Sequence, residues 1–402
     1  MALKINVKKS GFADVKNLVK HITEKNRVIK ATPAKEVSAV FPINENAKRL
    51  HPDYQKMAIS KVIDHAGAGA KTYVFKADKA AYFRAGQYLS VALTIDGSVL
   101  TRPYSISSSP DLTKDGEYAI TVRRTPNGFA SDWILDNWKA GDEVTVSEPL
   151  GNFFYEELRD CDDVIALAGG SGITPFLSMA YAIRDKAEDF NLTILFGSRT
   201  EDSILFKDEL DAIAKECDKV KVVHALSEEE RDGFEHGFIN ADIISKYAPS
   251  DRDYSVFMCG PEAMYRFAEG ELKKLGLDRK HVRRELLGVT KKVWEKDGYP
   301  SEAKGKTFSV TVKIGGDEKV IPASADEPVL VAIERAGIAA PSRCRSGECG
   351  WCRSKLVSGE VYVPEENDEG RRRSDKQNGY IHLCSSFALS DLVLEVPATY
   401  IK

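Results

Sequence analysis

The sequence has no apolar run that approaches the roughly 20 residues needed to cross a bilayer. Its opening stretch, MALKINVKKSGF, lacks the apolar segment of a signal peptide. The net charge of -4 is small for 402 residues, and no basic tract of the kind that binds nucleic acid is present. We therefore predict a cytoplasmic protein that neither inserts into a membrane nor binds nucleic acid.

Internal repeats and extended low-complexity tracts are also missing, which excludes solenoid and fibrous architectures. A chain of 402 residues is too long for one hydrophobic core to be the expected arrangement. The hydrophobic share of 43% and the charged share of 29% are those of ordinary globular domains. The sequence therefore predicts a multidomain protein.

Periodicity divides the chain into blocks. Short strand-like runs such as YLSVALTI and YAITVRRT, separated by turns, predict an antiparallel barrel or sandwich over residues 59–157. Apolar strands alternate with helical stretches over residues 158–290, which predicts βα units on a parallel sheet. The charged stretch over residues 291–305 reads as a linker, and residues 306–402 as a small mixed α/β domain.

Residues 1–58 form an N-terminal extension to which the sequence assigns no chemistry. Its first part has apolar residues spaced for one face of a helix; they are Phe12, Val15, Leu18, Val19 and Ile22. The segment that follows contains Pro33, Pro42 and Pro52, which we interpret as breaks in regular structure.

Four of the seven cysteines follow the spacing C-x4-C-x2-C with a distant fourth member. They are Cys344, Cys349, Cys352 and Cys384. This is the plant-type spacing for a [2Fe-2S] cluster, in which one tight loop supplies three thiolates. Gly347 and Gly350 would let that loop bend around the cluster and point backbone N–H groups at its sulfur atoms. The alternative is a zinc site, although zinc motifs usually present two short cysteine pairs.

The remaining cysteines have no such spacing. Cys161 and Cys217 are predicted to be ordinary thiols. Cys259 differs because it begins a Cys-Gly-Pro turn directly after the apolar strand YSVFM.

The run RPYS after a predicted strand combines a cation, an aromatic ring and a hydroxyl. Arg102 suits a flavin phosphate, Tyr104 a flavin ring and Ser105 the N5 edge. Taken alone, such residues are more often plain surface residues. Downstream, Gly128 and Ser131 precede a helix whose N-terminal N–H groups could bind a pyrophosphate, which favours FAD over FMN.

A glycine-rich turn, GGSGITP, follows the strand VIALA and opens a helix. Such a turn lets the backbone approach a pyrophosphate, although a simple βα turn is the alternative. The turn contains Gly169, Gly170, Gly172 and Thr174, and the pair Ser198-Arg199 follows the next predicted strand, LTILFG. Ser198 and Arg199 could bind a 2′-phosphate or line the adenosine pocket, so NADH and NADPH both stay open, with NADH slightly favoured.

The order RPYS, GFAS, GDEVTV and PLGNFF resembles the flavin domain of the ferredoxin–NADP reductase superfamily, and GGSGITP with CGP resembles its nicotinamide domain. PSRCRSGECGWC and HLCSS resemble the ferredoxin domains fused to the reductases of bacterial oxygenases, apart from Trp351, where such domains more often have a small residue. The resemblance covers about residues 59–402. It implies an FAD-binding β-barrel, an NAD(P)-binding α/β domain and a C-terminal β-grasp ferredoxin domain. It also implies that Gly169, Gly170, Gly172 and Thr174 bind the pyrophosphate of the nicotinamide dinucleotide, and that Cys259, with Gly260 beside it, contacts the nicotinamide.

The resemblance implies that hydride passes from the nicotinamide to flavin N5 and that electrons leave singly through the cluster to an acceptor protein. Tyr104, Ser105 and Cys259 are then the residues nearest to hydride transfer, and Glu285 is a weaker candidate beside the flavin. Two alternatives stay open: an electron-carrying or redox-sensing subunit without nicotinamide turnover, and a flavoenzyme that reduces a small molecule directly. We hypothesise that residues 1–58 help to select the acceptor.

Overall fold

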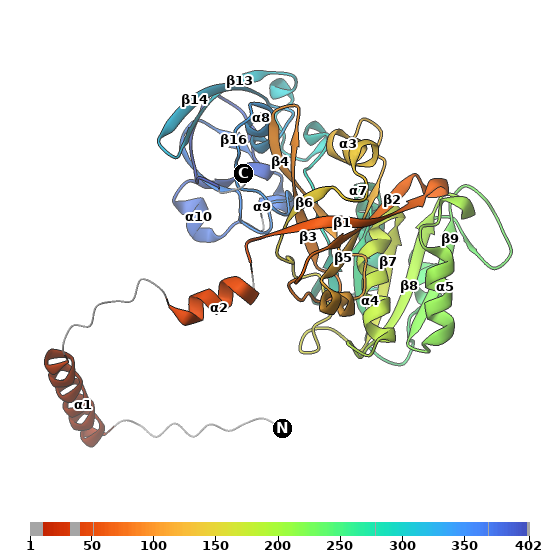
Figure 1. The fold of residues 1–402 in the computed structure, drawn as a ribbon, viewed down its shortest axis with the longest axis horizontal. Coiled ribbons are helices and arrows are strands. Elements are labelled where there is room, and N and C mark those ends of the chain that lie inside the picture. The colour runs from red at the N-terminus through yellow and green to blue at the C-terminus, as the bar shows by residue number, and fades with distance from the viewer. Residues whose placement is uncertain (1–10, 33–40, 51, 278, 369, 400–402) are drawn as a thin grey trace. The chain divides into compact units, whose positions relative to one another are not determined.

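The structure is a computed structural model that describes residues 11–32, 41–50, 52–277, 279–368 and 370–399 (Figure 1). The chain divides into two compact units, Met1–Leu50 and His51–Lys402, and each is described by itself. No helix in these described ranges is both long enough and apolar enough to cross a membrane.

The first unit contains α1 (Phe12–Ala31) and α2 (Pro42–Leu50). The helix predicted from the apolar spacing is therefore confirmed, and the apolar side chains of its predicted face are 50–89% exposed. The interpretation of Pro42 as a break was wrong, because this residue begins α2. Proline is tolerated in the first helical turn, where its missing N–H would have no partner. Pro33 lies outside the described residues.

The flavin-type domain is a six-stranded antiparallel sheet in the order β4-β3-β6-β1-β2-β5. The strands are β1 (Tyr54–His65), β2 (Ala70–Lys76), β3 (Tyr88–Ile95), β4 (Ser98–Ser105), β5 (Glu117–Arg123) and β6 (Glu143–Ser147). A bridge between Ile106 and Ile120 joins the two ends of the sheet into a barrel. The predicted helix is α3 (Phe129–Asn137). Because β1 starts at Tyr54, the barrel begins inside the segment predicted as extension.

The second domain is a parallel sheet in the order β10-β9-β8-β7-β11-β12. Its strands are β7 (Asp163–Gly169), β8 (Asn191–Ser198), β9 (Val220–Leu226), β10 (Glu235–His236), β11 (Ser255–Cys259) and β12 (Val282–Arg284). Its helices are α4 (Thr174–Arg184), α5 (Lys207–Glu216), α6 (Ala241–Tyr247) and α7 (Glu262–Lys274). The short α6 has no counterpart in the sequence-based prediction.

Helices cover both faces of this sheet, with α4 and α5 on one face (Figure 1). Alternate residues of β7 divide between the two cores: Val164 and Ala166 pack on the α4–α5 side, and Ile165 and Leu167 on the α6–α7 side. The strand order reverses at β7, which lies between β8 and β11. In open α/β sheets, ligands bind at the carboxyl ends of the strands beside such a reversal.

The third domain is a mixed sheet in the order β14-β13-β19-β15-β17, with a second pair of strands beside it. The strands are β13 (Thr307–Ile314), β14 (Asp317–Ser324), β15 (Arg353–Ser358), β16 (Val361–Tyr362), β17 (Tyr380–His382), β18 (Phe387–Ala388) and β19 (Leu392–Val396). The helices are α8 (Val329–Arg335), α9 (Glu365–Asp368) and α10 (Arg373–Gln377). The side chains of α8 fill the core beneath the sheet.

The stretch predicted as a linker is packed against the third domain. Val293, Tyr299 and Ala303 are buried and form one cluster with Ala325 and Phe387. Such burial ties this stretch to the domain that follows it, since a freely moving linker would leave these side chains in water. The boundaries 59–157, 158–290 and 306–402 themselves stay predictions.

Candidate functional site

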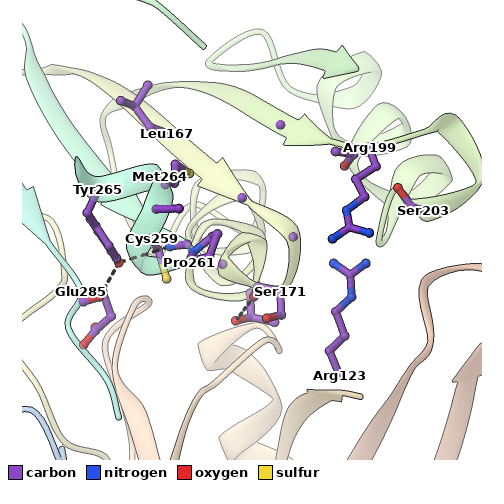
Figure 2. Close-up of a pocket in the computed structure, with 18 of the residues that line it drawn as sticks. Arg123, Leu167, Ser171, Arg199, Ser203, Cys259, Pro261, Met264, Tyr265 and Glu285 are labelled. Carbon is purple, nitrogen blue, oxygen red and sulfur yellow. Dashed lines mark hydrogen bonds between the residues drawn. The ribbon is translucent and has the colours of Figure 1, made fainter. Parts of the chain in front are cut away.

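A cleft of about 1160 Å³ lies between the barrel and the parallel sheet. Figure 2 shows its lining, and it gathers predicted residues that are far apart in the sequence. These are Tyr104, Ser105, Ser131, Gly169, Gly170, Gly172, Thr174, Ser198, Arg199, Cys259 and Gly260. Both domains thus supply walls of one cleft, as a site for two dinucleotides in contact requires.

Two predicted residues are not part of this lining. Gly128 is the N-cap of α3, so it sets the start of the helix, while Ser131 reaches the cleft. Arg102 donates from Nη1 to the carbonyl oxygen of Thr101 at 2.8 Å and lies 3.7 Å from a carboxylate oxygen of Glu334. The role of Arg102 as a phosphate ligand stays a prediction.

The carboxyl end of β4 presents the predicted flavin contacts. Tyr104 and Ser105 both line the cleft, and Ser105 is buried. Burial raises the pKa of the Tyr104 phenol above its usual value, so the ring stays neutral and offers a flat apolar face. These residues therefore provide a platform and a hydroxyl where an aromatic cofactor ring can lie.

The glycine-rich turn and the Cys-Gly-Pro turn are packed against each other at adjacent strand ends. In the β7–β11 ladder, Cys259 pairs with Ala168. A Cβ atom on Gly172 would lie 2.1 Å from the Cys259 carbonyl oxygen, so only glycine fits there without a shift. The 11-residue helix α4 starts directly after this turn, and its N-terminal N–H groups suit a pyrophosphate.

Cys259, Tyr265 and Glu285 form the inner wall of the cleft (Figure 2). The Tyr265 hydroxyl accepts from the Gly260 N–H at 3.2 Å and donates to the Glu285 carbonyl oxygen at 2.5 Å. Burial, and then the charge of Glu285, raises the pKa of the Cys259 thiol. A thiol with a raised pKa is a poor nucleophile, which agrees with a packing role for Cys259.

Glu285 is a buried carboxyl with an incomplete set of partners. It is 7% exposed, and its Oε2 atom has no hydrogen-bond partner among the described residues. Burial is the main cause that raises its pKa well above the usual value for a glutamate. An unpaired buried polar atom that lines a cleft is a place where a bound ligand can supply the missing hydrogen bond.

Sequence reasoning missed Arg123, which lies at the end of β5 within the strand run YAITVRRT. Figure 2 shows its guanidinium facing that of Arg199 across the cleft. Burial, and then the nearby Arg199, lowers the pKa of Arg123. Two cations that face each other form a site for an anion such as a phosphate group. No sequence signal pairs them, because they come from different domains.

A second feature missed from the sequence is an aromatic pair at the cleft. The rings of Phe238 and Phe267 lie 5.7 Å apart and line the cleft. Both side chains are substantially exposed, at 70% and 40%. Exposed aromatic rings in a binding cleft suit stacking with a planar base.

The four predicted cluster ligands come together in the third domain. The sulfur atoms of Cys352 and Cys384 are 3.3 Å apart, and Cys344 contacts both Cys349 and Cys384 through its sulfur. Backbone N–H groups point at these sulfurs: that of Gly347 lies 3.2 Å from Cys384 Sγ. Further donors are the N–H groups of Ser346, Cys349 and Trp351, each 3.4 Å from a cysteine sulfur.

N–H donors around converging sulfurs fit an anionic thiolate cluster. Gly347 and Gly350 have φ values of +88° and +72°, so both bend the loop as predicted. No set of three His, Cys, Asp or Glu side chains in the described part of the chain is arranged around a single metal ion. The fit of a [2Fe-2S] cluster therefore rests on the sulfur contacts and the N–H donors.

One edge of the cysteine loop faces solvent. Cys344, Cys352 and Cys384 are buried, whereas Cys349 is exposed. The neighbouring Trp351 is 40% exposed, and its ring packs 3.6 Å from the guanidinium carbon of Arg343. The exposed edge of the loop thus has a fixed aromatic side chain beside it.

The cleft and the cysteine loop are joined by a short segment after β12. Glu285 and Leu287 line the cleft, and the N–H of Gly288 donates to the carbonyl oxygen of Cys344 at 2.9 Å. Only Leu286 and Leu287 therefore separate Glu285, in the wall of the cleft, from Gly288 and its direct contact with the predicted cluster ligand Cys344.

Comparison with known families matches three models in order along the chain. Residues 61–155 match an oxidoreductase FAD-binding domain, residues 166–270 an oxidoreductase NAD-binding domain and residues 312–389 a 2Fe-2S iron-sulfur cluster binding domain. The predicted cofactors, FAD, a nicotinamide and [2Fe-2S], are thereby confirmed.

Similar proteins include a glycine betaine monooxygenase reductase subunit of Pseudomonas aeruginosa, 30% identical over 81% of this chain and 91% of that protein. The ferredoxin reductase component of a 3-ketosteroid-9-alpha-monooxygenase of Mycolicibacterium smegmatis is 30% identical over 84% of this chain and 95% of that protein. Among solved structures, phthalate dioxygenase reductase has a TM-score of 0.59 and 25% identity, covering 86% of this chain and 98% of that structure.

The order of domains, the cleft between the first two and the four-cysteine loop of the third all agree with these relatives. The antiparallel barrel, the parallel sheet and the C-terminal ferredoxin domain predicted from the sequence are confirmed. The chain therefore belongs to the oxygenase-type NAD(P)H reductases of the ferredoxin–NADP reductase superfamily, which carry a fused C-terminal [2Fe-2S] ferredoxin domain.

Proposed function

We propose that this chain is the reductase component of an oxygenase system and that it delivers electrons from NADH to a separate oxygenase protein. The relatives are reductase components of monooxygenases, and the phthalate dioxygenase reductase structure is described as a modular structure for electron transfer from pyridine nucleotides to [2Fe-2S]. The single observation that carries the proposal is the Gly288–Cys344 hydrogen bond, which links the nicotinamide and flavin cleft to the cluster loop.

Each predicted site residue would have a role that follows from its position in the cleft. Tyr104 would support the flavin ring, and Ser105 would hydrogen-bond its reactive edge. Cys259 would pack against the nicotinamide ring, and the turn over residues 169–174 would hold the pyrophosphate of the donor at the start of α4. Ser198 fits an adenosine contact, since its buried Oγ has no partner among the described residues.

A flavin held by Tyr104 and Ser105 would supply two-electron chemistry with the nicotinamide, and a [2Fe-2S] cluster held by the four cysteines would supply one-electron transfer to the acceptor. Burial raises the pKa values of Cys259 and Glu285, which favours the uncharged form of each group at the inner wall of the cleft.

The preference for NADH is supported by Glu228. Its carboxylate lines the cleft 3.6 Å from the guanidinium of Arg199. A carboxylate can accept a hydrogen bond from a ribose 2′-hydroxyl, whereas it repels a 2′-phosphate and competes for the arginine that would bind it. We therefore propose that the donor is NADH.

Electrons would leave at the exposed edge formed by Cys349 and Trp351. Exposed tryptophan side chains are favoured anchors of protein interfaces, because a large ring loses little conformational entropy when it is covered. The packing of Trp351 on Arg343 holds the ring in place before a partner arrives. The acceptor would then cover this edge.

We also propose a cytoplasmic location. Cys161 and Cys217 are free thiols, and a reducing compartment preserves free thiols and thiolate-bound clusters.

The experiment that tests the function is an anaerobic titration of the purified holoprotein with NADH and, separately, with NADPH, followed in the visible spectrum. Bleaching of both the flavin and the cluster bands by NADH at lower concentration than NADPH is the expected result. Bands that do not respond to either donor would show an electron carrier without nicotinamide turnover. Reduction of the flavin without the cluster would indicate a flavoenzyme that acts on a small molecule directly.

A further inference from the structure

A buried carboxylate connects the cluster loop to the flavin domain. Glu334, on α8, is 3% exposed, and Arg345, inside the four-cysteine loop, is 2% exposed. Their side chains form two parallel hydrogen bonds of 2.5 and 2.9 Å. Arg102 of β4 reaches the same carboxylate from the flavin domain, at 3.7 Å. One anion is thus shared by two cations from different domains.

A second contact crosses the same boundary at the preceding residue of β4. The hydroxyl of Thr101 lies 2.7 Å from the hydroxyl of Ser342 and 2.9 Å from the Ser342 carbonyl oxygen. Thr101 and Ser342 are both fully buried. Ser342 is two residues before Cys344, so Thr101 contacts the start of the cluster loop directly, while the next residue, Arg102, contacts Glu334 on α8.

The same strand carries the predicted flavin contacts. Tyr104 lies three residues after Thr101 on β4. A β-strand rises about 3.3 Å per residue, so roughly 10 Å of rigid backbone separates the grip on the cluster loop from the flavin platform. The strand stands at one end of the six-stranded sheet order and pairs with β3 along its whole length. β4 therefore acts as a spacer of fixed length between the two cofactor sites.

The loop end of this connection has a strained backbone that needs support. Arg345 has φ +63°, a conformation that residues with a side chain rarely adopt. The bidentate pair with Glu334 holds this residue in that conformation, since two parallel hydrogen bonds fix both position and orientation. Without the carboxylate, the buried Arg345 guanidinium would lose both of its hydrogen bonds to Glu334, and the partly buried Arg102 would lose its ion pair.

We propose that Glu334 is a positioning residue for electron transfer from the flavin to the cluster. Through Arg345 it sets the conformation of the cluster loop, and through Arg102 it holds that loop against the strand that carries Tyr104 and Ser105. Glu334 does not line the cleft, and its described side-chain hydrogen bonds go to Arg345. The inference rests on the proposed function, because it assumes that electrons pass from flavin to cluster.

The test compares the holoprotein with the variants Glu334→Gln and Glu327→Gln. Glu327 is a matched control, because it also forms a two-point pair with an arginine of its own domain, Arg335. Unlike Glu334, it forms no ion pair with the flavin domain among the described residues. Anaerobic stopped-flow mixing with NADH would follow the flavin bands, and freeze-quench electron paramagnetic resonance would follow the reduced cluster. Hydrogen exchange of the loop over residues 342–349 in the oxidised holoprotein gives a readout that does not depend on turnover.

The expected result for Glu334→Gln is flavin reduction at the unchanged rate, cluster reduction slowed about tenfold or more, and faster exchange in the loop. Glu327→Gln should match the unsubstituted protein in all three measurements. Cluster reduction at the normal rate in Glu334→Gln, with a normal cluster spectrum, would overturn the inference. Failure of the unsubstituted protein to reduce its cluster with NADH would instead overturn the proposed function.

Glu334→Gln could lose its cluster and so hide the effect; Thr101→Val addresses this case from the other domain. It removes the hydroxyl that contacts Ser342 and leaves the Glu334–Arg345 pair intact. Slower cluster reduction with a full cluster content supports β4 as the spacer. An unchanged rate in Thr101→Val, combined with cluster loss in Glu334→Gln, would show that Glu334 only stabilises the loop and would overturn the positioning role.

Discussion

Gly172 and Cys259 are packed so closely that a Cβ atom on the glycine would lie 2.1 Å from the cysteine carbonyl oxygen and 2.7 Å from the Gly260 nitrogen. The contact holds the turn after β7 against the turn after β11. These two turns supply the predicted pyrophosphate and nicotinamide contacts. The donor site therefore depends on a backbone-to-backbone contact that leaves no room for a side chain.

We expect Gly172→Ala to separate the two turns, because backbone atoms cannot move aside as the end of a flexible side chain can. Overpacking of this kind costs about 1–3 kcal/mol. The apparent melting temperature should fall and the KM for NADH should rise. The control is Gly270→Ala, since Gly270 lies within α7 with no atom within 4 Å of the added Cβ. That control should keep the KM and stabilise the protein by about 0.5–1 kcal/mol.

Arg123→Gln should weaken the binding of NADH. The substitution removes one of two cations that face each other across the cleft, and a hydrogen bond to a charged group contributes about 1.5–3 kcal/mol, so the KM should rise about tenfold to a hundredfold. Steady-state kinetics at two ionic strengths would measure it. An unchanged KM would show that Arg123 has no contact with the donor. Arg252→Gln is the control, because its pair with Asp163 lies at the opposite end of β7.

Glu228→Gln should narrow the preference for NADH over NADPH. Removal of the carboxylate ends its repulsion of a 2′-phosphate and releases Arg199 from its ion pair. We expect kcat/KM for NADPH to rise about tenfold while the value for NADH falls, which corresponds to about 1.4 kcal/mol. Steady-state kinetics with NADH and with NADPH would measure both values of kcat/KM. Equal changes of kcat/KM for NADH and NADPH would show that Glu228 does not contact the 2′ position of the donor's ribose.

Removal of residues 1–50 should leave the reductase core intact. The division of the chain falls after Leu50, and β1 starts at Tyr54, so the cut spares the barrel, whereas a cut at residue 58 would remove part of a strand. The shortened protein should keep its flavin and cluster spectra and reduce an artificial dye at the normal rate. Coupling to the acceptor should weaken if the extension selects it. Loss of dye reduction would contradict the hypothesis.

Local spacing made the cluster site predictable. C-x4-C-x2-C places three ligands in one loop, and a loop that surrounds two irons needs glycine at defined points, which Gly347 and Gly350 confirm with positive φ values. The periodicity of apolar residues along the sequence predicted the strands and most of the helices. Residues 54–58 were misplaced because a strand that follows a proline-rich segment resembles its continuation, and α6 was missed because seven residues are too few to show a helical period.

The sequence by itself determined the order of the domains and the types of cofactor and predicted the cluster ligands, because each depends mainly on motifs of residues close together in the chain. Tertiary structure alone decided which two cations face each other across the cleft and which carboxylate is shared by two other cations, Arg102 and Arg345. Arg123 meets Arg199, and Arg102 meets Glu334, across separations of tens to hundreds of residues. Such pairs form only when separately folded layers pack against each other, so no local pattern encodes them.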